Sequence, residues 1–435
     1  MQSQLDTILQ SIVESFELAG LAVGIVQGDE LAYAQGFGVH NIETGTPITP
    51  NSVFYTASIS KTFVATAIMQ LVEMGSVDLD EPVITYLTYF TLNDESVSNI
   101  TIRHMLSHIS GMPDVEDYYW DQPTDDVDAL ENYVRSLHEH TLLSTPGEAF
   151  AYSNMAYEVL GDVIAKVTGQ PFETTINEII FKPLGMSNST FLRPTQMTSP
   201  HVRIPHLAVS PVYPYNRTHT PSSTCHASLM DLSRWVRMFL NGGIFLDGQR
   251  ILRDASVETM WQQQFEIDED EYMGLGWFVE PYADDTKRFV YHEGGDIGFL
   301  TNIAILPEES LAVIILSNSA LTPIWEIMDI ALTAARGHEI PNDSIPLPPA
   351  LLPLSHTVMT LGQEAALAQA QTLQQTHPDD YTFDTDLFYF PAFHASKILR
   401  QPQIALDILR LCKALYPNSD QVQAYLAELE DWHVR

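Results

Sequence analysis

Apolar positions along the first three quarters of the chain follow two spacings, which predict two kinds of element. Strand-like runs at residues 21–27 and 30–38 are joined by a two-residue turn, which predicts a hairpin. Helical spacings and irregular loops dominate from about 80 to 250. Four further strand-like runs lie between 274 and 318, and a helical pattern follows over 321–337. This order predicts an α/β body whose sheet is interrupted by a helical region.

The pattern changes after Gly337. Residues 338–355 are rich in proline and lack a helical period, which predicts an extended linker between a body over 1–337 and a C-terminal domain over 356–435. Four helical patterns follow the linker, and the third has the spacing of the second helix of a tetratricopeptide repeat. A single repeat does not bury its own faces, so we expect this helical extension to dock on the body or on a second subunit, as a homo-oligomer. Packing is favoured here over peptide binding.

Composition and charge narrow the class of protein. A hydrophobic content of 45% in 435 residues supports a substantial core, and the net charge of −36 disfavours binding to nucleic acid or to anionic membranes. No apolar run is long enough for a membrane span, and the N-terminus carries no secretory pattern, so we expect a cytoplasmic protein unless a signal was trimmed. Cys225 and Cys412 fall in different predicted domains, which argues against a disulfide framework.

The sharpest chemical signal is the S-x-x-K pair Ser58 and Lys61, the one such motif among six lysines. A helical pattern from Ser58 to Gly75 places the two side chains one turn apart on the same face. A serine hydroxyl becomes a good nucleophile when a neighbouring base takes its proton, and a desolvated lysine can be that base. The alternative reading is a plain helix N-terminus with a solvated lysine.

Two further motifs follow in chain order. Tyr152 and Asn154 form Y-x-N in TPGEAFAYSN, and His292 and Gly294 form H-x-G in FVYHEGGDIGF. Alone, the tyrosine could hydrogen-bond within its loop and the histidine could end a strand. A second Y-x-N in LYPNS is better read as a turn after a helix. Three motifs in order, each in a suitable kind of segment, argue against coincidence.

With these motifs the chain resembles the serine β-lactamase and penicillin-binding-protein superfamily. The resemblance is strongest to the branch of class C β-lactamases, D-aminopeptidases, D-Ala-D-Ala carboxypeptidases and β-lactamase-like esterases. It extends over about residues 10–337 through segments such as GLAVGIVQGDELAYAQGFG, TIRHMLSHISGMPD, FKPLGMSNSTF and MGLGWFV. It implies a β-lactamase-like sandwich, in which an antiparallel sheet is flanked by helices and an all-α region forms the opposite wall of the active-site cleft.

The resemblance also implies roles for the motif residues. Ser58 would attack a carbonyl carbon and form an acyl-enzyme, while Lys61 and Tyr152 would share the proton transfers, in an order the sequence leaves open. Asn154 would orient the lysine and the substrate amide. The backbone N–H groups of Ser58 and Gly295 would stabilise the oxyanion, and neither a metal nor a cofactor is implied.

Departures from the family pattern bear on the substrate, expected to be a small ester, amide or short peptide. His292 stands where class C β-lactamases carry a lysine, so a fixed cation that would anchor a substrate carboxylate is lost. Lowering the pH toward 6 should charge this histidine in part. Ser222, Ser223 and Thr224 occupy a stretch that is often glycine-rich in relatives. Amide or peptide cleavage is therefore favoured, with a carboxylesterase as the alternative and a true β-lactamase or a non-enzymatic binding module behind both.

Overall fold

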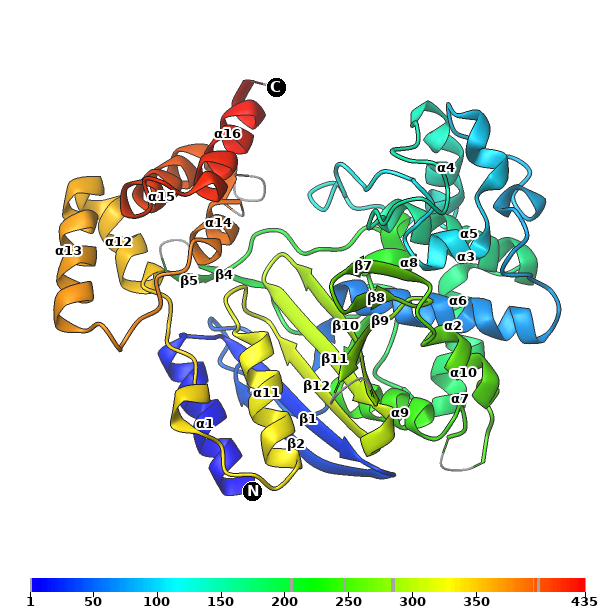
Figure 1. Cartoon of the computed structure of the whole chain (residues 1–435), viewed down its shortest axis with the longest axis horizontal. Helices are drawn as coiled ribbons and strands as arrows, with labels where there is room; N and C mark the ends of the chain where they lie inside the picture. Colours follow the sequence, from blue (N-terminus) through cyan, green and yellow to red (C-terminus); the bar gives the residue numbers. More distant parts are fainter. Residues whose placement is uncertain are drawn as a thin grey trace.

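A computed structural model describes residues 2–203, 206–245, 248–282, 286–393, 395–396 and 400–434. Its centre is an antiparallel sheet with the strand order β2-β1-β12-β11-β10-β9-β8-β7 (Figure 1). The strands are β1 (Gly20–Gln27), β2 (Glu30–Gly38), β7 (Phe265–Asp268), β8 (Glu271–Met273), β9 (Phe278–Tyr282), β10 (Lys287–Asp296), β11 (Phe299–Leu306) and β12 (Leu311–Ser317). The predicted hairpin, the antiparallel sheet and the mixed α/β class are confirmed.

Pairing of β1 with β12 joins the beginning of the body to its end. Leu21 lies opposite Ser317, and Ile25 lies opposite Val313. Both strands are buried on both faces, which explains why they read as continuous apolar runs instead of alternating ones. On one face the sheet is covered by α1 (Gln2–Ser15) and α11 (Ile324–Ala335), which share a hydrophobic core with it (Figure 1).

The other face of the sheet packs against α2 (Ser60–Glu73), α9 (Leu229–Leu240) and the inserted helical region. The remaining helices here are α3 (Ile102–Leu106), α4 (Ala129–Ser136), α5 (Asn154–Thr168), α6 (Phe172–Ile176), α7 (Lys182–Leu184), α8 (Thr220–Ser223) and α10 (Asp254–Met260). Two small antiparallel pairs accompany them, β3 (Val53–Tyr55) with β6 (His226–Ser228) and β4 (His201–Arg203) with β5 (Leu207–Val209). One continuous core joins most of these elements to the sheet, while Val202 of β4 belongs to a separate small cluster.

The C-terminal residues form α12 (Leu351–Leu361), α13 (Gln363–Thr376), α14 (Asp386–Phe393), α15 (Pro402–Leu415) and α16 (Asp420–Val434). The last four correspond to the four predicted helical patterns. The predicted linker is partly wrong, because α12 begins at Leu351, inside it. Pro353 lies in the first helical turn, where a missing N–H breaks no intrahelical bond, and Leu351, Leu352 and Leu354 are buried. The likeness to a tetratricopeptide repeat and the domain boundary at 337 stay predictions.

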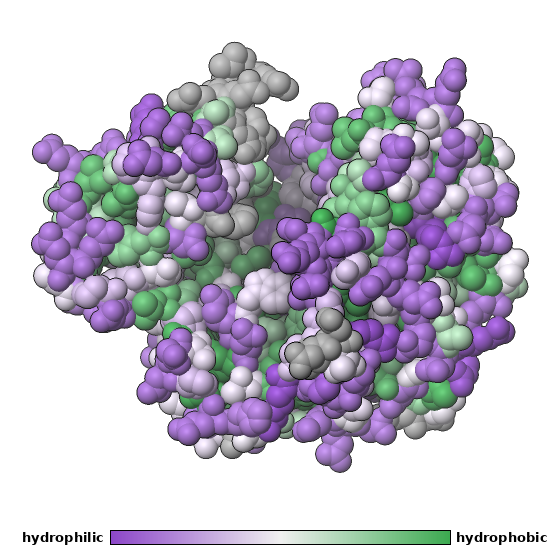
Figure 2. Space-filling view, in the orientation of Figure 1, coloured by the Kyte–Doolittle hydropathy of each residue, from purple (hydrophilic) through white to green (hydrophobic). Residues whose placement is uncertain are grey.

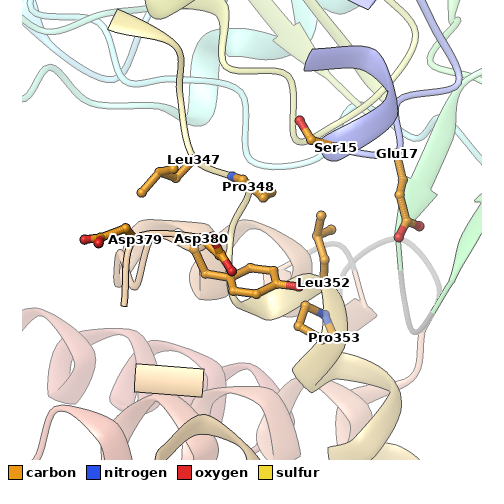
Figure 3. A pocket seen from close by; sticks show the side chains of 9 residues that line it. Ser15, Glu17, Leu347, Pro348, Leu352, Pro353, Asp379 and Asp380 are labelled. Atoms are coloured by element: carbon orange, nitrogen blue, oxygen red, sulfur yellow. The ribbon is translucent and has the colours of Figure 1, made fainter. Parts of the chain in front are cut away.

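The C-terminal helices contact the body at several places. Leu321, in the loop before α11, belongs to the same hydrophobic cluster as α12 to α16. An ion pair joins Arg400 to Asp121, and a pocket of about 520 Å³ lies between Ser15 at the end of α1 and Tyr381 (Figure 3). Figure 2 shows a mostly hydrophilic face that is hollowed where these helices meet the body. Within the described ranges, no helix is long and apolar enough to cross a bilayer.

Candidate functional site

Ser58 lies in a 3₁₀ turn, Ala57–Ile59, directly before α2. The predicted helix therefore begins at Ser60 instead of Ser58. Ala57 has a φ of 47°, a left-handed conformation that is unusual for a residue with a side chain. Ser60 stabilises the turn, because its Oγ donates to Ala57 O at 2.6 Å and accepts from Cys225 N at 2.9 Å. This strained turn leaves the Ser58 side chain partly exposed, while its neighbours are buried.

Lys61 is completely buried, and its Nζ is surrounded by acceptors. It lies 3.0 Å from Ser58 Oγ, 2.5 Å from Asn154 Oδ1 and 2.9 Å from the carbonyl oxygen of Ser222. Burial lowers the pKa of Lys61 to about 7, against the opposing effect of nearby carboxylates led by Asp114. The predicted proximity of hydroxyl and amine is thus present, and the amine can lose its proton near neutral pH.

Tyr152 reaches the same serine from the helical region. Burial raises the pKa of Tyr152, and a hydrogen bond to Ser58 works against that rise. Lys61 Nζ lies 4.9 Å from the centroid of the phenol ring, so both groups meet at Ser58. The other face of the ring stacks on His108, with centroids 4.2 Å apart, and His108 Nδ1 accepts from Ser153 N at 3.0 Å. Stacking and the adjacent backbone contact fix the direction of the tyrosine.

Asn154 begins α5, where its side chain connects Lys61 to the carboxylate of Asp114, a residue outside the three sequence motifs. Ser153 is the N-cap, and its Oγ accepts from Ala156 N at 3.1 Å. The backbone N and the Nδ2 of Asn154 both donate to Asp114 Oδ1, at 2.7 Å and 3.0 Å. Because the amide donates to Asp114, its oxygen must face Lys61.

Strand β10 forms the opposite wall and approaches the serine closely. A Cβ on Gly294 would lie 2.3 Å from Thr56 O and 3.0 Å from Ser58 N, so glycine is required there. Thr301 Oγ1 donates to Thr56 O at 2.9 Å, which ties this turn to the sheet. Pairing of β10 with β9 ends at Tyr291, and none of the described strands pairs with this edge of β10 over residues 292–296. Gly295, on this edge, is exposed.

His292 is buried, with 1% of its surface exposed. Its Nδ1 lies 2.7 Å from Glu293 O, so Nδ1 carries the proton, and its Nε2 has no hydrogen-bond partner among the described residues. Burial lowers the pKa of His292 to about 3, and the nearby Lys61 lowers it further. The expectation that pH 6 would partly charge this histidine is therefore wrong, because burial keeps it neutral.

The sequence motifs did not identify three side chains that lie at the site, namely Asp114, His108 and Asp296. The first two lie in TIRHMLSHISGMPD, a segment that the family resemblance already contained. Asp296 lies two residues beyond Gly294, accepts from Tyr55 Oη at 3.2 Å and from Ile297 N at 2.7 Å, and burial raises its pKa to about 6. Among the described residues, no group of three or more potential ligands could hold a metal ion.

Sequence comparisons assign the chain to a known family. The profile of the Beta-lactamase family matches residues 5–335. Penicillin-binding protein 4 of Amycolatopsis lactamdurans is 30% identical over 315 residues, which cover 70% of this chain and 81% of that protein. Protein flp of Staphylococcus aureus (strain MW2) is 28% identical over 324 residues, or 73% of this chain. The match spans only 63% of Flp, less than two thirds of its length.

Solved structures give the same result for the fold. The octameric penicillin-binding protein homologue from Pyrococcus abyssi is similar with a TM-score of 0.68 and 26% identity, covering 82% of this chain and 81% of that one. The penicillin-binding protein from Bacillus halodurans matches with a TM-score of 0.62 and 22% identity, covering 77% of this chain and 100% of that chain, and it supports the fold alone. By the family profile, which matches most of its length, the chain belongs to the Beta-lactamase family.

Proposed function

We propose that this protein is a serine hydrolase that cleaves an amide or peptide bond through an acyl-enzyme on Ser58, in the manner of penicillin-binding proteins and D-aminopeptidases. Family membership supports serine hydrolysis in general. The observation that carries the proposal is the placement of Ser58 Oγ, which lies 3.0 Å from a buried Lys61 and hydrogen-bonds to Tyr152. One hydroxyl thus contacts two groups that can move protons.

The two pKa shifts divide the proton transfers. Lys61, with a pKa of about 7, can accept the Ser58 proton while the Oγ–carbon bond forms, whereas Tyr152 stays protonated because burial raises its pKa. Tyr152 can then donate to the leaving nitrogen as the carbon–nitrogen bond breaks, and recover a proton from Lys61. A water molecule, deprotonated by the same pair, hydrolyses the acyl-enzyme and releases Ser58.

The open edge of β10 supports an extended, peptide-like substrate. Backbone groups of residues 292–296 that lack a described strand partner can pair with a substrate backbone, as in other cases of strand addition. The N–H groups of Ser58 and Gly295 would hold the oxyanion. His292 is neutral, while the carboxylates of Asp114 and Asp296 contribute negative charge around Lys61, which favours neutral or cationic substrates over carboxylates.

A hydrolysis panel tests the substrate class. Purified protein would be assayed against D- and L-aminoacyl p-nitroanilides, matched p-nitrophenyl esters and a chromogenic cephalosporin, with kcat/KM as the ranking quantity. We expect turnover of anilides, with the acyl group trapped on Ser58 by intact mass and peptide mapping. Ester turnover without anilide turnover would indicate a carboxylesterase, and a dominant cephalosporin activity would indicate a β-lactamase.

A fluorophosphonate probe tests the nucleophile independently of any substrate. We expect stoichiometric labelling at Ser58 in the native protein and none in Ser58→Ala. Thermal unfolding of the variant would control for its fold. Stoichiometric labelling at a different serine would refute the assigned role of Ser58.

We also propose that the C-terminal helices support a homo-oligomer. The Pyrococcus abyssi homologue is octameric, which is a property of that protein. In this chain Leu361, at the end of α12, is 74% exposed. Light scattering of the purified protein and of Leu361→Glu measures the oligomeric state, and a monomer at every concentration would reject this proposal.

A further inference from the structure

A second buried polar cluster adjoins Lys61 through the backbone of Ser222. It consists of Glu158 on α5, Ser222 on α8 and His219 just before α8. Glu158 Oε1 accepts from Ser222 Oγ at 2.6 Å and from His219 Nδ1 at 3.1 Å. The carbonyl oxygen of Ser222 in turn accepts from Lys61 Nζ at 2.9 Å. A continuous chain of contacts therefore leads from a buried carboxylate to the amine of the site.

Close packing of two helices makes this cluster rigid. Gly161, one turn after Glu158 on α5, lies against Pro221 of α8, and a Cβ on Gly161 would come within 2.1 Å of the proline ring. Only a glycine lets α8 approach α5 this closely. The aromatic rings of Tyr118 and Tyr133 enclose His219, with centroids 4.9 Å and 5.0 Å from its ring. This packing holds α8 against α5 where Ser222 meets Glu158.

The carboxylate of Glu158 is not fully compensated within its own cluster. The residue has no exposed surface, and its Oε2 has no hydrogen-bond partner among the described residues. A buried carboxylate with an unpaired oxygen is costly unless an opposite charge lies nearby. Lys61 supplies that charge, since Glu158 is one of the carboxylates that favour the charged form of the lysine.

We propose that Glu158 is a positioning residue for Lys61. Through Ser222, Glu158 fixes the carbonyl oxygen that accepts from the Lys61 amine, and its carboxylate holds a negative charge near that amine. The cluster thereby sets the pH at which Lys61 can act as a base. This inference rests on the proposed role of Lys61 in deprotonating Ser58. It also gives a function to Ser222, one of the polar residues in the stretch that is often glycine-rich in relatives.

The direction of the effect follows from the charges around the amine. Among the described residues, the titratable or charged groups around Lys61 are Asp114, Glu158, Asp296, His108, His292, Tyr152 and Tyr157. Removing the charge of Glu158 would leave desolvation less opposed, so the lysine would lose its proton at lower pH. The acidic limb of the rate profile, where a base must be deprotonated, would then move to lower pH.

The test compares two buried carboxylates on the same helix. Glu158→Gln removes the charge near Lys61, and Asp162→Asn removes a charge one turn further along α5. Asp162 is also buried, accepts from Tyr89 and is not among the charges that act on Lys61. We expect the acidic limb of kcat/KM to shift down by roughly one pH unit in Glu158→Gln. In Asp162→Asn we expect an unchanged limb, even if stability falls equally.

Two readouts separate this inference from the proposed reaction. The pH dependence of fluorophosphonate labelling reports Ser58 activation without a substrate, and the ¹³Cε resonance of Lys61 reports its titration directly in a protein with six lysines. If anilides are not cleaved but labelling shifts as expected, only the proposed substrate class fails. An unshifted limb and an unshifted Lys61 titration in Glu158→Gln would overturn the positioning role.

Two further variants test the charge argument in case Glu158→Gln does not fold. If Glu158→Gln does not fold, the double variant Glu158→Gln with His219→Gln replaces the pair with two amides that can hydrogen-bond to each other. The same downward shift is expected there. Glu158→Asp keeps the charge and should keep the limb near its native position, while the retracted carboxylate lowers kcat. If the acidic limb of kcat/KM lay at as low a pH in Glu158→Asp as in Glu158→Gln, the charge-based argument would be contradicted.

Discussion

The helical wall and the sheet wall around Ser58 differ in how Lys61 and strand β10 are hydrogen-bonded. On the helical side, Lys61 directs its amine at Ser58, Asn154 and the carbonyl of Ser222, all within 3.0 Å. On the sheet side, His292 Nε2 has no hydrogen-bond partner among the described residues, and the β10 edge beyond Tyr291 pairs with none of the described strands. The amine of Lys61 is thus fully bonded, whereas the sheet wall leaves hydrogen-bonding groups available.

We infer from this difference that the helical wall serves the chemical step and the sheet wall serves substrate recognition. A fully bonded lysine is held in one geometry before any substrate arrives, as a proton acceptor needs to be. An unpaired strand edge is suited to a partner that brings its own donors and acceptors. We therefore expect changes on the helical wall to act on kcat and changes on the sheet wall to act mainly on substrate choice.

The largest effect is expected at the helical wall. Lys61→Ala and Tyr152→Phe should each lower kcat by about 10²- to 10⁴-fold, because each removes a proton carrier from Ser58. The double variant should lose little more than the worse single one, since the groups act as a unit. Steady-state kinetics with thermal unfolding as the fold control measures this. Independent, additive losses would show that the two residues do not cooperate.

A smaller effect is expected where the two walls meet. Gly294→Ala places a Cβ 2.3 Å from Thr56 O and should push β10 away from Ser58, lowering kcat/KM by roughly 10²-fold. Gly295→Ala is the matched control, because its Cβ would meet only the Leu300 side chain at 3.3 Å and its N–H is kept. Equal losses in both variants would mean that close approach at Gly294 is unimportant.

The sheet wall should govern the response to a substrate carboxylate. At pH 7.5 we expect a carboxylate-bearing substrate to have a lower kcat/KM than its methyl ester, because His292 is neutral. His292→Lys should raise that ratio by about tenfold. Since burial lowers the pKa of His292 to about 3, the native ratio should stay flat between pH 6 and 8. A ratio that rises as the pH falls to 6 would show that the histidine does become charged.

The smallest effect on chemistry is expected from the C-terminal helices. Truncation after Gly337 should leave kcat within about threefold, because none of the site residues described above lies beyond it. It should lower the melting temperature, since Leu321 packs in the C-terminal cluster and would become exposed. Leu321→Ala in the full chain is the control for that packing. Loss of activity toward large substrates alone would place the tail at the substrate site.

Much of this site could be predicted from local pattern. Ser58 and Lys61 follow from a spacing of three residues, because a helical turn brings such side chains together. Tyr152, Asn154 and His292 could be predicted only as members of an ordered set. Asp114 could not, because an acidic residue in an acidic surface loop resembles any other solvated carboxylate until its partner is known. The helix α12 was missed because Pro353 and the prolines that precede the helix mask a buried leucine pattern.

The sequence by itself determined the hairpin of β1 and β2, the strands β9 to β12 with the helix after them, the pairing of Ser58 with Lys61, and the absence of a fixed cation at position 292. Each of these properties depends on residue type or on the spacing of residues along the chain. Only the tertiary structure decided that Lys61 is buried away from solvent, that His292 stays neutral, and that Glu158 is connected to the lysine through Ser222. These properties depend on desolvation and on charges brought together from α5, α8 and β10, and the distance between such groups is set by packing.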